Sequence, residues 1–399
     1  MMKREGRTVM VFGVGTLQRS IIERARQMGL RTVGIDPLTD AACRDMVDVY
    51  EVVGGQDYEK TLEVANRYNV TSIVTAATDK PLVMMARIAR TMGLPFYSVE
   101  TAEWSTDKFR MKQRFLEAGI PCARGRLVTA VGEVEDLEMP LVVKPRDNSG
   151  SRGVKVCRNK EELAGAFREA LAFSKMESLL VEEFIEGQEY SIEAIHQHGK
   201  SAVLQFTEKT TTPFPYNVEM AHCQPARLSE DTRKAIRKIV SDISDVMHFD
   251  NCASHTELKI NARGIFVIET SPRLGGDMIT SHLVPLSTGV NMEDLVLRMA
   301  EGEEVCIPTM EKDMASCVRF LDLPEGVVQQ ISPHLSDVMG WPGVVDFDFG
   351  LQVGDSVPAI HSSLDRFGHI VIKGKSSDEV ERRAEKYTSD IIDMIKIRK

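Results

Sequence analysis

Residues 255–277 read HTELKINARGIFVIETSPRLGGD, and this stretch decides the fold that the sequence predicts. The pattern is typical of two strands joined by a tight turn. Residues 262–264 (ARG) have the length of a three-residue hairpin loop, and Gly264 accepts the positive φ that such a loop needs. The resulting register pairs Asn261 with Ile265 across the hairpin.

The same register places Leu258 opposite Ile268 and Glu257 opposite Glu269. The two glutamates would then lie on one face, with Cβ atoms roughly 5 Å apart. Two bare carboxylates at this distance repel each other, and a hard cation between them removes the repulsion. Mg2+ prefers oxygen ligands and often shares them with phosphate groups. The alternative is an exposed hairpin whose two glutamates face water.

The residues after the second strand suit the binding of an anion. Ser271 offers a hydroxyl, and Arg273 offers a planar fork of donors. Gly275 and Gly276 allow the backbone to approach a ligand closely. We therefore interpret the hairpin and its continuation as one wall of a binding site.

Length and composition predict a multidomain globular protein. The chain has 399 residues, 43% of them hydrophobic and 27% charged, which gives a prior of two to four domains. The net charge of −10 disfavours a general nucleic-acid or anionic-membrane binder. We find no signal peptide and no apolar run long enough for a membrane span, and we expect a cytoplasmic protein. The seven scattered cysteines form no CxxC pair and indicate reduced thiols rather than zinc ligands or disulfides.

The first 103 residues alternate strand and helix patterns, which predicts a doubly wound parallel sheet with helices on both faces. We expect helices over residues 17–28, 57–68 and 79–92, and three strands between them. Gly13 and Gly15 before the first helix, with Asp36 after the second strand, resemble half of a dinucleotide fingerprint. The third glycine is missing, so NAD binding is an alternative to a turn that packs the helix or lines a substrate cleft.

Two lysines occupy unfavourable positions that a bound phosphate would explain. Asp107 marks a helix start, and Lys108 lies in the first turn, where it opposes the helix dipole. Lys144 lies within an apolar strand, and a buried lysine needs a partner. The loop that follows is rich in glycine and serine, and its N–H groups can cradle phosphate oxygens. The alternatives are a solvated lysine and an ordinary flexible hairpin.

The middle of the chain contains a strand at residues 179–183 that ends in a turn and resumes at residues 190–195. An exposed strand end can pair with a purine edge, and a nearby carboxylate can bind ribose. Residues 205–228 show little regular pattern, and we expect a long functional loop there. Helices are predicted at residues 229–247 and 291–300. From about residue 311 the pattern becomes rich in strands and closes with a helix at residues 377–394, which predicts a smaller α+β domain.

Taken together, these segments resemble the ATP-grasp superfamily over nearly the whole chain. The shared features occur in one order: a lysine helix, a strand lysine with a glycine loop, an E-E-x-x-x-G-x-E segment at residues 182–189, and a two-glutamate hairpin that ends in x-P-R. The resemblance implies a multidomain α/β and α+β protein with the ATP-grasp fold. Its expected domains are a pre-ATP-grasp domain (1–103), an ATP-grasp domain (104–310, with a lid at about 123–185) and a C-terminal α+β domain (311–399).

The resemblance also implies an ATP site that contains Mg2+ or Mn2+. Lys108 and Lys144 would bind the phosphates, and the metal ligands would be Glu257, Glu269 and Ser271, although the family usually has Asn at position 271. The loop residues that would close over the phosphates are Ser149, Gly150, Ser151 and Gly153. The residues that would meet adenine and ribose are Glu182, Glu183, Phe184, Ile185 and Glu189.

Within the superfamily, the chain is most similar to L-amino acid ligases and carnosine-synthase-like enzymes. The similarity is carried by HTELK at 255–259, PRLGGD at 272–277, and PFPY at 213–216 followed by His222. It implies an ADP-forming carboxylate–amine ligase that proceeds through an acyl phosphate. Arg273, Lys144 and Ser271 would be the catalytic residues. The substrate residues would be Lys209, His222, Arg273, Gly275 and Gly276, although Lys209 and His222 fit ordinary surface loop residues equally well.

Three other functions stay open at this point. The first is an ATP-grasp carboxylase or purine-pathway enzyme, including a carbamoyl phosphate synthetase-like one. Biotin-dependent carboxylases carry Gln-Val-Glu-His after the arginine, whereas this chain has Leu274 to Asp277. The second is a non-catalytic ATP-binding subunit, and the third is an NAD-dependent dehydrogenase. We expect small-molecule carboxylate and amine substrates, no nucleic-acid or membrane partner, and a possible homodimer.

Overall fold

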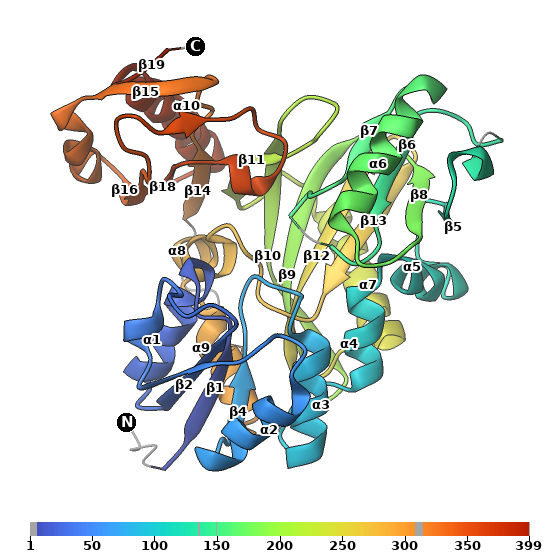
Figure 1. Ribbon diagram of the computed structural model, residues 1–399, viewed down its shortest axis with the longest axis vertical. Helices are drawn as coiled ribbons and strands as arrows, with labels where there is room; N and C mark the ends of the chain where they lie inside the picture. Colours follow the sequence, from blue (N-terminus) through green and yellow to red (C-terminus); the bar gives the residue numbers. More distant parts are fainter. Residues whose placement is uncertain (1–5, 135, 149, 308–313, 399) are drawn as a thin grey trace.

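The computed structural model describes residues 6–134, 136–148, 150–307 and 314–398. An N-terminal lobe, a lid and a C-terminal lobe surround a central domain, in blue, green, orange-red and yellow-green respectively (Figure 1). Strands in the described ranges form four sheets. No helix in those ranges is long and apolar enough to cross a membrane.

The N-terminal lobe confirms the predicted parallel sheet. Its strand order is β3-β2-β1-β4, and every neighbouring pair is parallel. The strands are β1 (Thr8–Phe12), β2 (Arg31–Asp36), β3 (Val49–Val52) and β4 (Ser72–Val74). Helix α1 (Arg19–Gln27) covers one face, and α2 (Tyr58–Arg67) and α3 (Leu82–Met92) cover the other. The prediction missed β3, because its four partly exposed residues form no apolar run. It also began the first helix too early, because Thr16–Gln18 is a 3-10 turn.

The lid is a small four-stranded sheet with the order β5-β8-β6-β7. Its strands are β5 (Gly125–Val128), β6 (Leu141–Pro145), β7 (Lys155–Cys157) and β8 (Leu179–Glu183). Helix α6 (Leu163–Phe173) packs on this sheet around a core that includes Leu141, Val143 and Phe167. Two helices, α4 (Val99–Thr106) and α5 (Lys108–Glu117), connect the N-terminal lobe to the lid. The turn after β8 therefore leads into a different sheet, and the strand does not resume in its own sheet as expected.

The central sheet has eight strands in the order β13-β12-β9-β10-β11-β14-β18-β16. The first five are β9 (Gln188–Gln197), β10 (Lys200–Thr211), β11 (Glu219–Gln224), β12 (Cys252–Asn261) and β13 (Gly264–Ser271). The other three are β14 (Ala315–Phe320), β16 (Val344–Asp348) and β18 (His369–Gly374). Because β14 pairs with β11, the C-terminal lobe extends the sheet of the central domain. The helices of the central domain are α7 (Glu230–Met247), α8 (Val284–Thr288) and α9 (Met292–Ala300).

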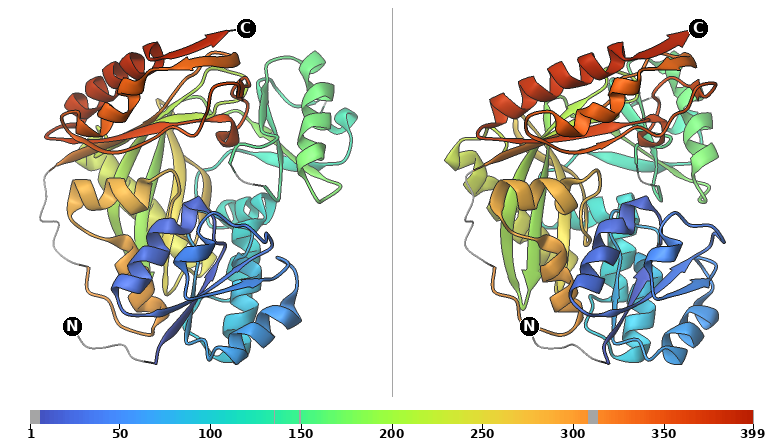
Figure 2. Two further views of the ribbon diagram at one scale, coloured as in Figure 1. Left: turned by 60° about the vertical axis from the view of Figure 1, so that its left-hand side comes forward. Right: turned by 90° about the vertical axis from the view of Figure 1, so that its left-hand side faces the viewer.

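The C-terminal lobe confirms the predicted α+β composition. Helix α10 (Ser377–Asp393) packs between the end of the central sheet and a three-stranded sheet, as the turned views show (Figure 2). The small sheet consists of β15 (Gly326–Ile331), β17 (Ser356–Val357) and β19 (Ile395–Arg398). Val380, Ala384 and Ile391 of the helix are fully buried in this core.

The hairpin differs from its prediction at the turn but not at the glutamates. Asn261 pairs with Gly264, so the loop has two residues rather than three, and Leu258 pairs with Val267. A register shift between Glu257 and Leu258 then restores the expected pair of Glu257 and Glu269. The shift is a β-bulge, which adds one residue to one strand and re-aims the side chains beyond it.

The expected long loop at residues 205–228 is wrong. Most of this segment forms β10 and β11, which pair antiparallel with Lys209 opposite His222. The prediction failed because polar residues such as Lys209 face a buried polar site, so the segment lacks the apolar alternation of an ordinary strand. Lys209 and His222 are therefore buried strand residues and not surface loop residues.

Candidate functional site

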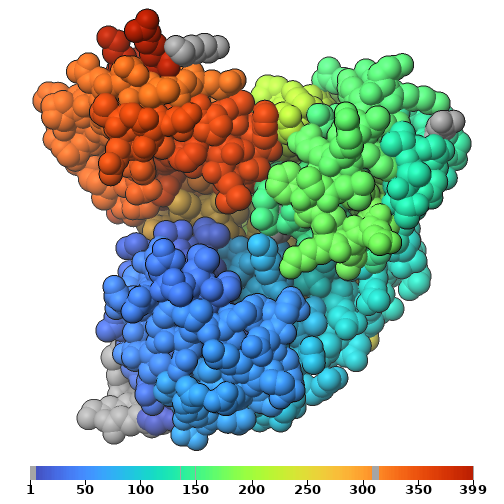
Figure 3. Space-filling view, viewed as in Figure 1, coloured from blue at the N-terminus to red at the C-terminus, as the bar shows by residue number. Residues whose placement is uncertain are grey.

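The candidate site lies on one face of the central sheet, where the lobes meet around a hollow that the space-filling view shows (Figure 3). Side chains alternate between the two faces of a strand, so residues two apart share a face. Cross-strand pairing places Glu193 beside His255 and Ser271, and Ser191 beside Glu257 and Glu269. These two rows form the floor of the site.

Lys144 is buried in the lid, as the sequence predicts, and its partner is Glu182 of the neighbouring strand. The other oxygen of Glu182 lies 2.8 Å from Nζ of Lys112, a residue of α5 that the sequence analysis did not single out. Burial, Lys112 and Lys108 together lower the pKa of Lys144 although Glu182 opposes them. Two buried lysines thus share the single carboxylate of Glu182.

Lys108 is held at the start of α5, as predicted. Asp107 caps the helix by accepting from the N–H groups of Phe109 and Arg110, and it also binds the guanidinium of Arg146. Lys108 Nζ contacts Oε2 of Glu269. Burial lowers the pKa of Lys108, but Glu269, Asp79 and Glu257 outweigh it and leave the pKa above its ordinary value.

Glu257 and Glu269 face each other in register, but their side chains bind different lysines. Oε1 of Glu257 lies 2.8 Å from Nζ of Lys209, which also lies 3.0 Å from Glu189 and 3.5 Å from Glu219. Burial raises the pKa of Glu257, yet Lys209 and His255 outweigh it and hold that pKa well below its ordinary value. The ligand atoms of Glu189, Glu219 and Glu257 lie within 4.8 Å of one another.

Beside this cluster, a cavity of about 250 Å3 opens at the hinge between the lid and the central sheet. Glu189, Lys209, Asn217 and Lys259 line it, together with Gly187. Asn217 donates to Oε2 of Glu189 at 3.3 Å, and Lys259 Nζ lies 3.6 Å from the same oxygen. The cavity is polar and lies next to the carboxylate that the sequence predicts to bind ribose.

The loop between β6 and β7, where the sequence predicts a phosphate cradle, has a left-handed backbone at three positions. Gly150, Ser151 and Gly153 all have positive φ, between 56° and 72°. A Cβ at Gly153 would lie 3.1 Å from Pro145 and Phe173, so glycine is also needed there for packing. Ser149, the remaining predicted loop residue, lies outside the described residues.

Arg273 and Ser271 share one partner, Asp79, which lies in the segment between β4 and α3. Ser271 Oγ donates to Oδ1 of Asp79 at 2.6 Å, and Arg273 donates to both oxygens at 2.8 and 3.1 Å. Burial raises the pKa of Asp79, but Arg273 and Ser271 outweigh it and keep the carboxyl ionised. A parallel bridge between Ala76 and Leu274 joins the same two segments.

Gly275 and Gly276, which the sequence predicts to admit a ligand, lie close to other groups of the protein. A Cβ at Gly275 would lie 2.7 Å from Nδ1 of His255 and 2.9 Å from Oε2 of Glu193. A Cβ at Gly276 would lie 3.3 Å from the Cβ of Ala77. The protein itself therefore leaves no room for a side chain at Gly275 and little room at Gly276.

The C-terminal lobe contributes Arg366, which donates to both oxygens of Asp277 at 2.8 and 2.9 Å. His222 Nε2 lies 3.2 Å from the same carboxylate. Asp277 and Met278 both have positive φ although neither is glycine, and such strain is often found at functional sites. Burial opposes the ionisation of Asp277, but Arg366 and His222 lower its pKa far more.

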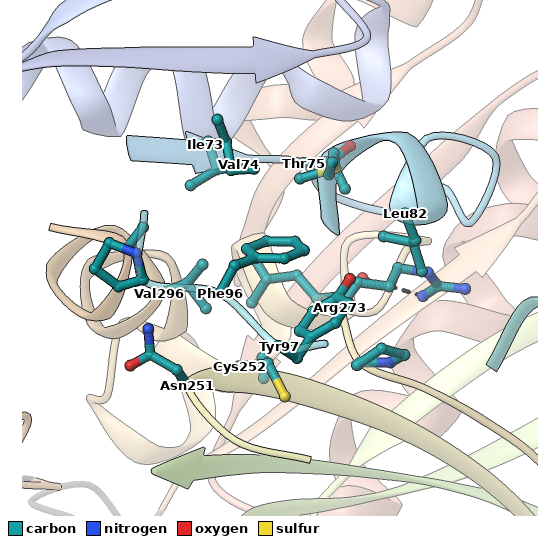
Figure 4. A pocket seen from close by; sticks show the side chains of 16 residues that line it. Ile73, Val74, Thr75, Leu82, Phe96, Tyr97, Asn251, Cys252, Arg273 and Val296 are labelled. Carbon is teal, nitrogen blue, oxygen red and sulfur yellow. Dashed lines mark hydrogen bonds between the residues drawn. The ribbon is translucent and has the colours of Figure 1, made fainter. Parts of the chain in front are cut away.

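A second, small cavity lies behind Arg273, between β4 and α3 on one side and Cys252 on the other (Figure 4). Its volume of about 30 Å3 admits one or two waters and no amino acid. The hydroxyl of Tyr97 is buried here without a hydrogen-bond partner among the described residues. We interpret this cavity as a water site, not as a substrate site.

The dinucleotide alternative finds no support in the N-terminal loop. Oδ2 of Asp36 accepts from the N–H of Val14 at 2.9 Å, and Oδ1 accepts from Leu38. The side chain of Gln18 fills the space over Gly13 and binds the N–H of Gly15. Gly13 and Gly15 therefore make room for the side chain of Gln18. The carboxylate of Asp36, which would bind ribose in a dinucleotide site, instead accepts hydrogen bonds from the backbone.

Comparison with known proteins agrees with this geometry. Residues 137–281 match the family model described as ATP-grasp domain. The chain contains an ATP-grasp domain. Residues 319–392 match the model described as L-amino acid ligase C-terminal domain 2, which covers the strands and helix of the C-terminal lobe.

Individual proteins are similar to this chain over a longer stretch than the family models cover. An uncharacterized protein, y4rH, of Sinorhizobium fredii is 25% identical over 94% of this chain and 81% of its own length. Alanine–anticapsin ligase of Bacillus amyloliquefaciens is also 25% identical, over 71% of this chain and 62% of its own length. The crystal structure of L-amino acid ligase from Bacillus licheniformis shares the fold with a TM-score of 0.84, at 21% identity and 98% coverage of both chains.

Sequence reasoning missed several residues of the candidate site. They are Asp79, Lys112, Glu193, Glu219 and Arg366. Glu219 and Arg366 come from segments that the sequence presents as irregular, and Asp79 comes from another domain. The signal for Glu193 is its place four residues after Glu189, on the same face of β9.

Proposed function

We propose that this protein is an ATP-dependent carboxylate–amine ligase that joins amino-acid substrates through an acyl phosphate. The observation that carries the proposal is the position of Lys108. Lys108 contacts Glu269. It also lies close enough to Lys144 to lower the pKa of that lysine, and close enough to Glu257 for this carboxylate to raise the pKa of Lys108. A lid lysine, a helix lysine and the two-glutamate hairpin therefore converge on one place.

ATP and Mg2+ fit the residues present. Members of the ATP-grasp superfamily bind ATP with Mg2+. We assign the phosphates to Lys108, Lys144 and the loop at Gly150, and the ribose to Glu189 beside the hinge cavity. Carboxylate oxygens are the donors that Mg2+ prefers, and Glu257 and Glu269 supply them from opposed positions. The metal would neutralise charge on the transferring phosphoryl group.

In the proposed reaction, a substrate carboxylate oxygen attacks the γ-phosphorus of ATP, and ADP leaves. An amine nitrogen then attacks the acyl carbon, phosphate leaves and the amine loses a proton. Arg273, held by Asp79, would stabilise negative charge on the acyl group. Closure of the lid would keep water from the acyl phosphate.

The substrate residues follow from the floor of the site. We assign substrate contacts to His222, Gly275 and Gly276, next to Asp277 and Arg366 of the C-terminal lobe. Glu219 faces this region, and burial together with neighbouring carboxylates raises its pKa although Lys209 opposes them. An ammonium group of a substrate would relieve this crowding of negative charge. Lys209 contacts three carboxylates, and we assign it to holding them in place.

The proposal is tested by incubating the full chain with ATP, Mg2+ and pairs of amino acids and measuring ADP and phosphate release. We expect release that depends on the amino acids, and its loss in Glu269→Gln. Glu230→Gln, an exposed change in the first turn of α7, is the control. Release that requires bicarbonate instead of an amine would favour the carboxylase alternative, and ATP binding without turnover would favour a non-catalytic subunit.

A further inference from the structure

A buried pair of residues, Glu193 and His255, lies on the floor of the site without a role in the reaction described above. The two residues are directly opposite each other on β9 and β12. Glu193 has no exposed surface, and His255 is 8% exposed. Nδ1 of His255 donates to Oε1 of Glu193 at 2.6 Å. A buried ionised carboxylate destabilises the protein unless a hydrogen-bonded, oppositely charged partner lies beside it.

The other ring nitrogen of His255 faces Glu257. Nε2 lies 3.3 Å from Oε1 of Glu257, the same oxygen that Lys209 approaches at 2.8 Å. Carboxylates only accept hydrogen bonds, so the ring donates from both nitrogens. Among the described residues, none donates a hydrogen bond to Oε2 of Glu257. One oxygen of this carboxylate is therefore anchored twice, and the other stays available.

The ring of His255 is closely covered by the backbone of Gly275. Gly275 covers it so closely that a Cβ would lie 2.7 Å from Nδ1. On the opposite face of the sheet, Thr256 and Thr270 bond to each other at 2.7 Å and fix the neighbouring strand positions. The row Glu193, His255 and Glu257 is thus held from both sides.

We infer that Glu193 and His255 are positioning residues that fix the carboxylate of Glu257 and direct its free oxygen toward the metal ion. The inference rests on the proposed function, in which Glu257 is a metal ligand. Groups that orient a ligand typically change metal affinity by 10–100-fold when removed. The buried carboxylate of Glu193 holds the ring of His255, and this ring in turn holds the carboxylate of Glu257.

The chain offers a matched control in His196. It lies on β9 in the same sheet, is 1% exposed, and has both ring nitrogens bonded, to Ser201 at 2.8 Å and Ser254 at 2.7 Å. It contacts no carboxylate that we assign to the metal. His196→Asn and His255→Asn therefore both remove a buried ring from the same sheet, and only the second change removes a contact with Glu257.

The test measures the affinity of the full-length protein for Mn2+ by electron paramagnetic resonance, with a non-hydrolysable ATP analogue present. We expect His255→Asn to weaken Mn2+ binding about 10-fold or more, and His196→Asn to leave it unchanged. Glu193→Gln keeps an acceptor for Nδ1 but loses the charge, and we expect an effect of about threefold. The KM for Mg2+ should rise in the same order, with a smaller change in the KM for the amino acid.

Three results overturn the inference, and the third identifies a failure of the proposed function. If His255→Asn folds and binds Mn2+ like the wild type, the positioning role is wrong. If His255→Asn does not fold, Glu193→Gln is measured instead. Unchanged Mn2+ affinity in Glu193→Gln would also show that the positioning role is wrong. Glu257→Gln separates failure of the inference from failure of the proposed function. Unchanged Mn2+ affinity in that variant would show that Glu257 does not bind the metal, and the positioning role would then be wrong as well.

Discussion

Nε of Arg273 lies 2.8 Å from Oδ1 of Asp79, and this pair joins the N-terminal lobe to the end of the two-glutamate hairpin. Ser271 donates to the same oxygen, so Asp79 fixes two residues that the sequence places in the site. The remaining terminal nitrogen of Arg273, Nη1, donates to the carbonyl of Leu274. The orientation of the guanidinium therefore depends on a residue almost 200 positions earlier in the chain.

We predict that Asp79→Asn lowers kcat by at least about 10-fold while the affinity for ATP changes little. The neutral amide cannot accept from Arg273 with both of its atoms, and a small displacement of a positioned group has large kinetic effects. Steady-state kinetics with ATP and the amino-acid substrates varied separately measures both quantities.

The control for this change is Asp294→Asn, which removes a charged contact between Asp294 of α9 and Arg24 of α1. That pair also joins the two lobes but lies away from the site. Equal losses of kcat in the two variants would show that Asp79 merely holds the lobes together.

A second prediction concerns the buried group of Lys112, Glu182 and Lys144. Glu182→Gln leaves two buried lysines without a counter-charge and should destabilise the protein by about 3–5 kcal/mol. Lys144→Met leaves Lys112 paired with Glu182, so we expect near-normal stability but a KM for ATP raised about 10-fold or more. Chemical denaturation and ATP titration measure the two effects.

These two variants distinguish a structural from a ligand-binding lysine. If Lys144→Met binds ATP normally, Lys144 serves only to neutralise Glu182. If Glu182→Gln is as stable as the wild type, the three side chains do not form the interdependent group that the contacts indicate.

Much of the fold was predictable because local patterns specify it. Asp107, Ser229 and Asn291 cap the helices that the sequence predicts to begin there. The pairing of Glu257 with Glu269 was predicted from an incorrect turn, and a bulge compensated for the error. Bulges depend on packing across the sheet, so a hairpin loop length alone does not reveal them.

The rest of the site was not predictable from local pattern, because it depends on contacts between distant segments. Asp79 reaches Arg273 only because the N-terminal lobe packs against the hairpin. Arg366 reaches Asp277 only because the C-terminal lobe extends the central sheet. Strand β10 was mistaken for a loop because its inward positions carry polar residues such as Lys209. A buried polar site removes the apolar alternation by which strands are identified.

A third prediction concerns Gly275. In Gly275→Ala the new Cβ would overlap Nδ1 of His255 and Oε2 of Glu193, so one of them must move. We expect kcat to fall at least about 10-fold, and stability to fall by about 1–3 kcal/mol. Kinetics and thermal unfolding measure these effects.

Gly165→Ala provides the comparison for Gly275→Ala. Gly165 lies within α6, and a Cβ there would meet nothing within 4 Å. Alanine at that position should stabilise the lid by roughly 0.5–1 kcal/mol and leave kcat unchanged. Normal activity in Gly275→Ala would mean that the glycine is not needed for the position of His255.

A fourth prediction concerns pH. Glu293 of α9 is buried between the lobes, where Ser20 donates to it at 2.8 Å. Burial raises the pKa of Glu293 from 4.5 to about 7, so the folded protein binds a proton that the unfolded chain has lost between these values. Stability should therefore decline as pH rises from about 4.5 to about 7.

Glu293→Gln removes the titrating group and keeps an acceptor for Ser20. The variant should match the wild type near pH 4.5 and exceed it in stability at pH 8, by at most about 3 kcal/mol. Melting temperatures across this range measure the difference, with Glu59→Gln, an exposed first-turn change in α2, as the control. Parallel pH profiles for the wild type and Glu293→Gln would show that Glu293 stays ionised when buried.

The central claim, that ATP activates a substrate carboxylate for attack by an amine, is tested most directly by oxygen transfer. The full chain is incubated with ATP, Mg2+ and a pool of amino acids whose carboxylates carry 18O, and the released phosphate is analysed by mass spectrometry. The account predicts ADP, one 18O atom in each phosphate, and an amide product in equal amount. Phosphate without 18O, or release of AMP and pyrophosphate, would contradict it.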